Sequence, residues 1–579
     1  MKYAALLFTF LNLLHLIFCD FDLVILHNND IHGRFEQTER NSGTCQPKNR
    51  NTTCIGGFAR TAHVIRKHRE AAQNGTGPEV LYLYAGDTFI GTVWYTVHTW
   101  NISSTFMNLL RPDAQCLGNH EFDKGTKELG QYLSKLTFPT VTCNLDLSLE
   151  PNITPYVQKY IIIEKAGRKI GIIGYLTPET KKISSPEQTI FLDEIEEINK
   201  QAELLDQQGI KIIIAVGHSG YLKDKEIAEK VPLVDVVVGG HTNTFLWNGP
   251  QPDTDTIDGP YPTVITQPSG KKVPVVQAYA YTKYLGILNL TFSEMGDVLS
   301  YSGQPEFLVN SIPQDEDILK QLESYRPSTE AINGEIVASL QVTLDGHSCR
   351  LKECNFGNLI ADANVLYKAA YSMISWTDYP IGLMNGGSIR ASISRDSKLT
   401  VTRGEILETL PFGNQIVSLK LSGADLIKTL ELGIRSNGET SRGEFLQVSG
   451  LKVVYDRSKP PMSRVVSVHV RCGFCKIPKY DPIQLNRNYS IVTIDYLTDG
   501  FDGHYILKEK GFDKRYEDVS DVDALIWYLK RNDPVFAEVQ GRITFVNKSN
   551  NLSSASSGGL RHNCGLTAVI LLVSFLCVI

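Results

Sequence analysis

The chain has 579 residues, which is too long for one hydrophobic core and predicts at least two domains. Apolar residues make up 42% and charged residues 21%, so the composition excludes a mainly disordered protein. The net charge of -6 excludes the basic surface typical of nucleic-acid-binding proteins, and no nucleic acid is expected as a partner.

The first nineteen residues have the pattern of a secretory signal peptide. Lys2 precedes a largely apolar run from Ala4 to Phe18, and Asp20 restores polarity. About fifteen apolar residues are few for a membrane span, so cleavage is favoured over an uncleaved anchor or a buried strand. Residues 1–19 are therefore expected to be removed, although Ile17 is not the small residue that a cleavage site prefers.

Residues 20–310 alternate short apolar runs with helical patterns, which predicts a layered α/β domain. Helices are expected to begin near Gly57 and to cover residues 193–208. Buried strands are expected at Phe21–Leu26, Val80–Tyr84, Ile170–Ile173, Lys211–Val216 and Val234–Val238. Polar groups that follow such strand ends should gather along one edge of the sheet.

Five predicted strand ends, one of them Gln115–Leu117, lead directly into blocks rich in Asp, His, Asn and Gly. These blocks are Asn29-Asp30-Ile31-His32-Gly33, Ala85-Gly86-Asp87-Thr88, Gly118-Asn119-His120-Glu121, Gly217-His218-Ser219 and Gly239-Gly240-His241-Thr242-Asn243. Carboxylate, imidazole and amide ligands without thiolate suit catalytic zinc, manganese or iron, and not a closed structural zinc site.

The five blocks, in this order, resemble those of the calcineurin-like metallophosphatases, and most of all their 5′-nucleotidase branch. The resemblance implies two divalent metal ions with the ligands Asp30, His32, Asp87, Asn119, His218 and His241. Asp30 and His32 would hold one ion, Asn119, His218 and His241 the other, and Asp87 would bridge the two. Zinc is the expected metal, with manganese or another divalent ion as the alternative, and Asn243 is a candidate weak ligand. Two such cations would acidify a water molecule and clamp the phosphoryl oxygens.

His120 is expected to have a different role, because Asp123 follows three residues later, within reach of its ring. A carboxylate that binds one ring nitrogen orients the imidazole and favours its charged form. The resemblance makes His120 and Asp123 the dyad that stabilises the transition state or the departing oxygen. A contact at a helix N-terminus is the alternative.

Residues 311–333 are expected to form a linker helix, with Ile318, Leu319 and Leu322 at helical spacing. Residues 334–548 then carry their own strands and helices, which predicts a second α/β domain, and the resemblance implies that this domain binds the substrate. Strands are expected at Val453–Tyr455 and Val465–Val470, and a helix near Leu426–Leu432.

The resemblance implies one substrate-binding residue in the first domain, Asn119. The others lie in the second domain: Arg350, Asn385, Arg390, Phe412, Tyr496 and Asp502. The two arginines would hold a phosphate or carboxylate, the two rings would enclose a flat base, and Asp502 would accept from a ribose hydroxyl. Taken singly, each residue could instead belong to the core or to a surface ion pair. In the loop that contains Tyr496 and Asp502, Asp499 stands where the family has Asn, and Phe501 stands where it has Gly.

The cysteines indicate an oxidising compartment. Three pairs close in sequence are expected to form disulfides: Cys45 with Cys54, Cys349 with Cys354, and Cys472 with Cys475. The last is a C-x-x-C motif, for which a plain disulfide is favoured over a metal or redox site. For Cys116 and Cys143, the sequence does not say whether they pair. Eight sequons predict glycosylated surface loops, at Asn51, Asn74, Asn101, Asn152, Asn289, Asn488, Asn547 and Asn551.

Residues 549–579 have the pattern of a GPI-attachment signal, with small residues, a polar spacer and the apolar run Leu566–Ile579. Attachment is expected within residues 551–557, which would tether the mature protein to the outer leaflet of the plasma membrane; a secreted form is the alternative. A tail-anchored helix would need a longer apolar run.

The sequence thus predicts an extracellular 5′-nucleotidase that converts AMP to adenosine and phosphate. An apyrase-like hydrolase of ATP and ADP is the nearest alternative, and a catalytically inactive surface binding protein is the alternative of another class. The resemblance also implies a homodimer. A hinge near the linker is expected to bring the substrate to the metals.

Overall fold

The computed structural model describes residues 20–546, apart from residues 41, 46, 371, 373–374, 396–398 and 437–442. The predicted signal peptide and GPI-attachment region lie outside the described residues, as do the sequons at Asn547 and Asn551. Within the described part of the chain, none of the helices combines the length and apolar character needed to cross a bilayer.

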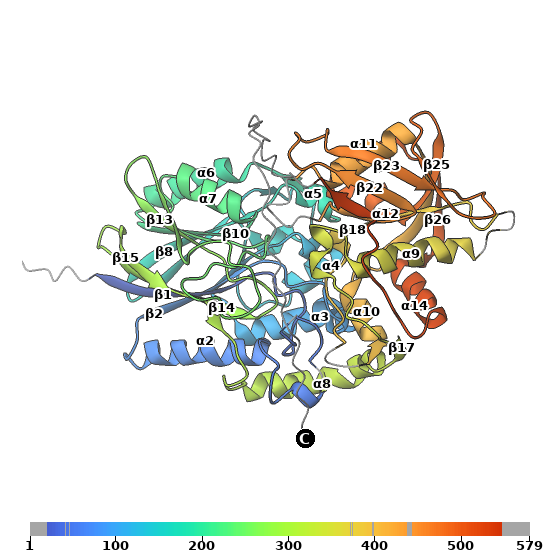
Figure 1. Cartoon of the computed structure of the whole chain (residues 1–579). Helices are drawn as coiled ribbons and strands as arrows, with labels where there is room; N and C mark the ends of the chain where they lie inside the picture. Colours follow the sequence, from blue (N-terminus) through green and yellow to red (C-terminus); the bar gives the residue numbers. More distant parts are fainter. Residues whose placement is uncertain are drawn as a thin grey trace, which may run out of the picture.

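Two stacked β-sheets form the first domain (Figure 1). The first sheet has the order β15-β14-β1-β2-β3-β4-β6, with β16 paired to β14. Its strands are β1 Phe21–Asn28, β2 Glu79–Ala85, β3 Ala114–Cys116, β4 Thr140–Val141, β6 Val157–Gln158, β14 Tyr284–Phe292, β15 Val298–Gly303 and β16 Glu306–Phe307. The second sheet has the order β12-β13-β11-β10-β8-β7. Its strands are β7 Tyr160–Lys165, β8 Arg168–Leu176, β10 Ile212–His218, β11 Val236–Val238, β12 Thr263–Thr266 and β13 Lys272–Val276.

The expected strands are present, but they are divided between the two sheets, so the prediction of a single sheet edge is wrong. β1, β2 and β3 run parallel in the first sheet, and β8, β10 and β11 run parallel in the second. The reason is that both sheets have an apolar inner face. Ile25 and Leu83 of one sheet and Ile172 and Ile214 of the other belong to one buried cluster. The carboxyl ends of both parallel sets meet on one side of this sandwich.

Helices cover both outer faces of the sandwich, which gives four layers. α2 Phe58–Gln73, α3 Val93–Leu110 and α8 Glu316–Asn333 pack on the first sheet. α6 Glu194–Gln207 and α7 Tyr221–Lys230 pack on the second. Shorter elements complete the domain: α4 Gly125–Leu133, α5 Thr180–Ile183, β5 Leu145–Asp146 and β9 Ile190–Phe191. This arrangement confirms the predicted layered α/β class.

The helix α8 follows the last strand of the first domain and leads to the second domain (Figure 1). Asp315 caps it by accepting hydrogen bonds from the backbone N–H groups of Asp317 and Ile318. Arg326 forms an ion pair of 2.9 Å with Glu36. This ion pair links α8 to the first domain.

The second domain contains three further sheets around one large apolar core. A five-stranded sheet has the order β21-β18-β25-β20-β26, with bounds β18 Ile381–Asn385, β20 Gln415–Ser422, β21 Leu446–Ser449, β25 Asn488–Ile494 and β26 Phe512–Ser520. A four-stranded sheet has the order β24-β23-β22-β27, with bounds β22 Leu451–Tyr455, β23 Val465–Arg471, β24 Tyr480–Pro482 and β27 Ile543–Phe545. A two-stranded sheet pairs β17 Ile336–Ser339 with β19 Thr400–Thr402.

The helices of the second domain pack against these sheets. They are α9 Asn355–Ala369, α10 Arg403–Thr409, α11 Gly423–Gly433, α12 Asp495–Thr498, α13 Tyr505–Lys510 and α14 Asp521–Arg531. α10 begins with a capping box, in which the side chains of Thr402 and Glu405 each bind the other residue's backbone N–H. This box fixes the start of the helix that faces the first domain.

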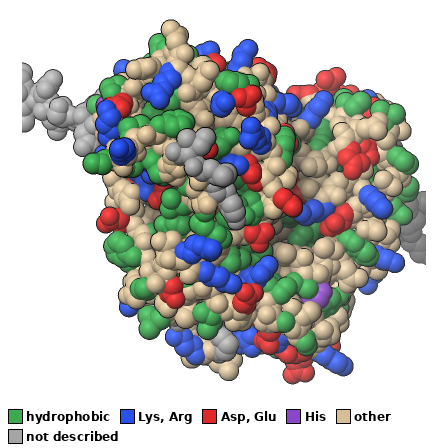
Figure 2. Space-filling model, turned by 90° about the vertical axis from the view of Figure 1, so that its right-hand side faces the viewer, with side chains coloured by type: hydrophobic (Ala, Val, Ile, Leu, Met, Phe, Trp, Pro, Cys, Tyr) green, Lys and Arg blue, Asp and Glu red, His purple; other side chains and the backbone are tan. Residues whose placement is uncertain are grey.

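Three disulfides join Cys45 to Cys54, Cys349 to Cys354 and Cys472 to Cys475. Cys116 and Cys143 are buried free thiols. The six sequon asparagines that the structure describes are all exposed, but Asn101 lies in α3, Asn289 in β14 and Asn488 in β25, so the prediction of loops is wrong for these three. On the face drawn in Figure 2, acidic and basic side chains are interspersed among polar and apolar ones.

Candidate active site

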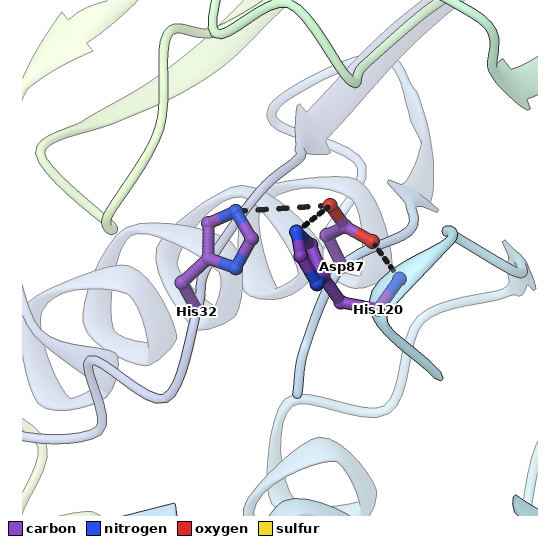
Figure 3. A group of neighbouring side chains, drawn as sticks. All are labelled: His32, Asp87 and His120. Carbon is purple, nitrogen blue, oxygen red and sulfur yellow. Dashed lines mark hydrogen bonds and ion pairs between the residues drawn. The ribbon is translucent and has the colours of Figure 1, made fainter. Parts of the chain in front are cut away.

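The loops that follow β1, β2 and β3 meet those that follow β10 and β11. His32, Asp87 and His120 point toward one another although three separate loops carry them (Figure 3). Oδ2 of Asp87 lies 3.7 Å from Nε2 of His32 and 4.0 Å from Nε2 of His120. It also lies 3.0 Å from Nε2 of His218. Asp87 is therefore the centre of the cluster.

The other predicted metal ligands surround Asp87. Oδ1 of Asp30 lies 3.7 Å from Nε2 of His32 and 3.8 Å from Nε2 of His218. Nδ1 of His241 lies 2.9 Å from Oδ1 of Asn119, and the backbone N–H of His241 donates to Oδ2 of Asp30. The structure thus brings together all six residues that were predicted as metal ligands.

The side chains around Asp87, which include His120 as well as the predicted ligands, fit a pair of divalent cations. His32, Asp87 and His120 form one group of possible ligand atoms, and Asp30, Asp87 and His218 form another, each within 4.8 Å. Asp87 belongs to both groups, as a bridging carboxylate would. Oδ1 of Asp30 is buried and has no hydrogen-bond partner among the described residues. A bound ion would satisfy this orphaned acceptor.

The electrostatics of the two carboxylates also favour a cation. Burial raises the pKa of Asp30 to about 6. Burial acts in the same direction on Asp87, but the neighbouring imidazoles of His218 and His120 outweigh it and hold the pKa of Asp87 well below its usual range. Two carboxylates in one dry site repel each other, and a divalent ion between them would remove that cost.

The backbone is strained at these positions. Asp30, His32, Asp87 and His241 have φ values of 51°, 49°, 64° and 81°, in the left-handed region that non-glycine residues seldom adopt. Strain of this kind persists only where surrounding contacts enforce it, and it clusters at functional sites. The loops are therefore built to direct these side chains inward.

One residue that sequence reasoning did not single out enforces part of this geometry. Glu121 is 2% exposed and accepts four backbone hydrogen bonds, two on each carboxylate oxygen. The donors are the N–H groups of Asp87, Thr88, Phe89 and Gly118. Glu121 thus holds the loop that carries Asp87 against the loop that carries Asn119. Its place in the motif around Asn119 was a signal that the sequence offered.

These two loops approach too closely for a side chain at Gly118. A Cβ atom there would lie 2.1 Å from Oδ1 of Asp87. Burial raises the pKa of Glu121 to about 7, with Asp87 as a further cause. The four N–H donors favour the ionised carboxylate, because each oxygen must accept.

A second buried acid supports His241 from behind. Asp224 accepts hydrogen bonds of 2.7 Å from the hydroxyl of Tyr175 and 2.6 Å from Nε2 of Gln277. Nε2 of Gln277 also donates to the carbonyl of Gly240, directly before His241. The pattern of the sequence held no sign of this network, because it joins residues from three separate elements.

His120 and Asp123 form the predicted contact. Nδ1 of His120 lies 2.6 Å from Oδ2 of Asp123, and the hydroxyl of Ser184 donates to Oδ1 of Asp123 at 2.6 Å. Burial alone would lower the pKa of His120, but the carboxylates of Asp123 and Asp87 outweigh it, so the pKa is raised. The imidazole is thus oriented, and its other nitrogen faces Asp87.

The second domain reaches directly into this site. Nη2 of Arg390 lies 3.1 Å from Nε2 of His32. The ring of Phe412 stacks on the imidazole of His120, with centroids 5.7 Å apart. The guanidinium of Arg390 lies over the same Phe412 ring at 5.9 Å. Two predicted substrate residues of the second domain therefore contact His32 and His120 of the first.

Arg390 lies close enough to two other arginines to repel both. Burial lowers the pKa of Arg350, and the charge of Arg390 is the next cause. Burial also lowers the pKa of Arg34, which Arg390 again reinforces. Arg34 lies over the ring of Tyr281 at 4.4 Å and donates to the carbonyl of His32. An anion between Arg350 and Arg390 would offset their repulsion.

The remaining predicted substrate residues form a hydrogen-bonded group. Asp502 accepts from Nδ2 of Asn385 at 2.7 Å and from the hydroxyl of Tyr496 at 3.1 Å. Phe501, which replaces the family's glycine, packs on Tyr496 with ring centroids 4.9 Å apart. This departure therefore supports the Tyr496 ring, and Asp502 is held from both sides. The candidate weak ligand Asn243 has a buried Oδ1 without a hydrogen-bond partner among the described residues.

A buried acid also joins the two domains. Glu408 of α10 accepts hydrogen bonds from Oγ1 of Thr44 at 2.5 Å and from its backbone N–H at 3.2 Å. Burial raises the pKa of Glu408 to about 7. Arg34 and Glu405 are the charged groups that face it.

Two family models match this chain. A calcineurin-like phosphoesterase model matches residues 23–245, and a model of the 5′-nucleotidase C-terminal domain matches residues 335–509. The first match includes all six predicted metal ligands, and the second includes the predicted substrate residues of the second domain.

Known proteins are similar over most of the chain. "Protein 5NUC" of Lutzomyia longipalpis is 43% identical over 537 residues, which are 91% of this chain and 93% of that protein. A snake venom 5′-nucleotidase of Naja atra is 40% identical, over 91% of this chain and 99% of that protein. An apyrase of Tabanus yao is 37% identical, over 91% and 94% of the two chains.

A solved structure has the same fold. The 5′-nucleotidase precursor of Thermus thermophilus superposes with a TM-score of 0.82 at 35% identity, over 91% of this chain and all of that one. Family membership implies divalent metal ions and a nucleotide substrate, which the donor set and the arginines described above fit. The chain therefore belongs to the 5′-nucleotidase family of calcineurin-like metallophosphatases, and it is a metal-dependent phosphoric monoester hydrolase.

Proposed function

We propose that this chain is an extracellular 5′-nucleotidase that hydrolyses nucleoside 5′-monophosphates, with AMP as the main substrate, by a two-metal mechanism. The observation that carries this proposal is the position of Arg390, whose guanidinium lies 3.1 Å from the imidazole of His32. A phosphate-binding group of one domain and a metal-binding group of the other thus share one site. The nucleoside would extend from there toward Tyr496 and Asp502.

We assign Asp30, His32, Asp87, Asn119, His218 and His241 as the residues that hold two ions, preferably zinc. When bound, the ions supply positive charge at the phosphoryl group and an acidified water molecule. Because Asp87 faces three imidazoles, it is the residue best placed to be shared by both ions. Glu121 and Gln277 keep the loops of Asp87 and His241 in place.

The dyad of His120 and Asp123 stabilises the charge that develops on phosphorus or on the leaving oxygen. Asp123 binds Nδ1, so the proton at Nε2 of the charged imidazole is directed into the site. Arg350 and Arg390 orient the phosphate, and Asn119 is placed to contact both an ion and the substrate. Phe412 covers one side of His120 and limits the access of water there.

In the second domain, Phe412 and Tyr496 would enclose the base, and Asp502 would accept from the ribose. The carboxylate of Asp502 is already oriented by Asn385 and Tyr496, so little ordering is needed when a ribose binds. Base stacking of this kind is worth about 1–3 kcal/mol.

An apyrase-like activity on ATP and ADP is the second candidate, because one relative is an apyrase. The two functions differ in products. The purified, metal-loaded chain should release phosphate and adenosine from AMP, and an apyrase would stop at AMP. No phosphate release from AMP would refute the proposal.

A surface binding protein without catalysis would be expected to have lost metal ligands, yet all six predicted positions retain suitable donors. Metal analysis after zinc or manganese supplementation should give two ions per chain. Fewer than two would favour the binding protein.

We also propose the domain division and location that the sequence predicts. Residues 1–19 would be removed, residues 20–310 and 334–548 would be the two domains, and residues 311–333 would contain the hinge. Residues 549–579 would direct attachment of a GPI lipid. Three disulfides and a venom relative support an extracellular location. Association into a homodimer would be tested by light scattering of the soluble chain.

A further inference from the structure

A polar groove lies at the N-terminal end of β1, the opposite end of that strand from Asp30. It has a volume of about 450 Å³, within the range of pockets that hold small ligands. Its lining residues come from β1, β14 and β15, here called the floor, and from the loop between α2 and β2, here called the wall. Its polar lining residues include Asp22, Thr76, Asn289, Thr291, Ser300 and Ser302.

The groove carries a modification signal on its own floor. Asn289-Leu290-Thr291 is a sequon, and all three residues line the groove. A second sequon, Asn74-Gly75-Thr76, belongs to the wall, where Gly75 and Thr76 are lining residues. Signals for attaching a sugar thus stand on two sides of one polar depression.

The side chain of Asn289 is free to bear a sugar. It is exposed, and among the described residues its side chain makes a single hydrogen bond, a long contact of 3.5 Å from Nδ2 to the carbonyl of Ser302. An N-linked sugar replaces only one of the two Nδ2 hydrogens, so this contact can persist. On the wall opposite, a Cβ atom on Gly75 would meet no atom within 4 Å.

The lining chemistry matches a sugar. The hydroxyl of Thr291 donates to Oδ1 of Asp22 at 2.8 Å, and the hydroxyl of Ser300 donates to Thr291 at 3.0 Å. Such hydroxyls both donate and accept, as sugar hydroxyls and an acetamide require. Pro78, on the wall, offers an apolar surface to the C–H face of a sugar ring.

We infer that Asn289 is N-glycosylated and that the first sugars of this glycan lie in the groove. In the modification, Nδ2 of Asn289 bonds to C1 of an N-acetylglucosamine, whose C1–O bond to a lipid pyrophosphate breaks. The pyrophosphate leaves with the bonding electrons, and one amide proton is released. The inference rests on the proposed extracellular location, because the donor belongs to the secretory route.

The test compares Asn289 with Asn488, an exposed sequon at the start of β25 in the other domain. The full chain is expressed by a secretory eukaryotic cell, and glycopeptide mass spectrometry measures occupancy at each sequon. The native protein is then treated with a peptide N-glycosidase. We expect release from Asn289 to be at least tenfold slower than from Asn488, with equal rates after denaturation.

A variant with a filled groove completes the test. Ser300→Trp places a large ring on the floor and retains both sequons, and it should raise the release rate at Asn289 to that of Asn488. Equal native rates in the unmodified chain would overturn the inference, and so would slow release that persists in Ser300→Trp. A glycan at Asn488 with none at Asn289 would overturn this inference but not the proposed extracellular location. The absence of a glycan at every sequon would refute both.

Discussion

The Phe412 ring of the second domain stacks on the His120 imidazole of the first, with centroids 5.7 Å apart and planes inclined by 25°. The residue expected to hold the base and the residue expected to support the leaving group are thus in direct contact. Closure of the two domains would therefore assemble the base pocket and the catalytic dyad together. Such a coupling would allow residues expected to bind the substrate to lie more than two hundred positions from the expected metal ligands.

Phe412→Ala should weaken nucleotide binding, because the substitution removes one face of the base pocket. Loss of about 1–3 kcal/mol of stacking corresponds to a rise of about 5- to 150-fold in KM for AMP. Steady-state kinetics measure this change. Phe536→Ala is the matched control, because Phe536 is an exposed ring of the same domain. An unchanged KM in Phe412→Ala would remove Phe412 from the pocket.

Glu121→Gln should lower metal content and activity together. The amide would turn an N–H₂ group toward two of the four backbone donors, and each unpaired buried donor costs about 1–3 kcal/mol. We expect fewer than two ions per chain and a fall of about 100-fold or more in kcat/KM. Glu128→Gln is the control, because Glu128 accepts a hydrogen bond from the hydroxyl of Tyr95 and lies outside the site. A Glu121→Gln enzyme with two ions and full activity would contradict the role of Glu121.

Asp123→Asn should reduce kcat by about 100-fold or more and leave KM nearly unchanged, because the dyad acts on the developing charge and not on binding. Ser184→Ala removes one hydrogen bond to Asp123 but retains the dyad, and should cost about fivefold. Rapid-quench measurement of the chemical step separates this effect from product release. A rise in KM with constant kcat would assign the pair to substrate binding.

Glu408 should make the contact between the domains sensitive to pH. Its pKa is raised from 4.5 to about 7, so its stabilising contribution is complete below pH 4.5 and is lost as pH rises through 7. The full change is about 3 kcal/mol. Glu408→Gln imitates the protonated form and lacks this dependence. The Tm values of the two chains should agree at pH 5, and the unmodified chain should have the lower Tm at pH 8. A constant difference across this range would refute the assignment.

Much of the fold was predictable, because local patterns determine it. The apolar run at Phe21–Leu26 became β1, and the charged segment before Gly334 became α8 with Asp315 as its cap. The division of the strands into two sheets was not predictable, because buried parallel strands of both sheets are apolar throughout.

The clustering of the candidate site residues was predictable from residue type and order, since Asp30 and Asp87 follow strand ends and His218 is the last residue of a strand. The sequence could not show the positive φ angles of these residues or the four N–H groups on Glu121, which depend on contacts between distant loops. It also could not show that Arg390 reaches His32, because that contact depends on how the two domains pack.

The central claim is that this site hydrolyses a nucleoside monophosphate. The most direct test measures the phosphate and nucleoside released from AMP, ADP and ATP by the purified chain loaded with zinc, with Asp87→Asn as the inactive control. The account predicts equal amounts of adenosine and phosphate from AMP, and none with Asp87→Asn. Release of phosphate from ATP and ADP with AMP as the final product would contradict it.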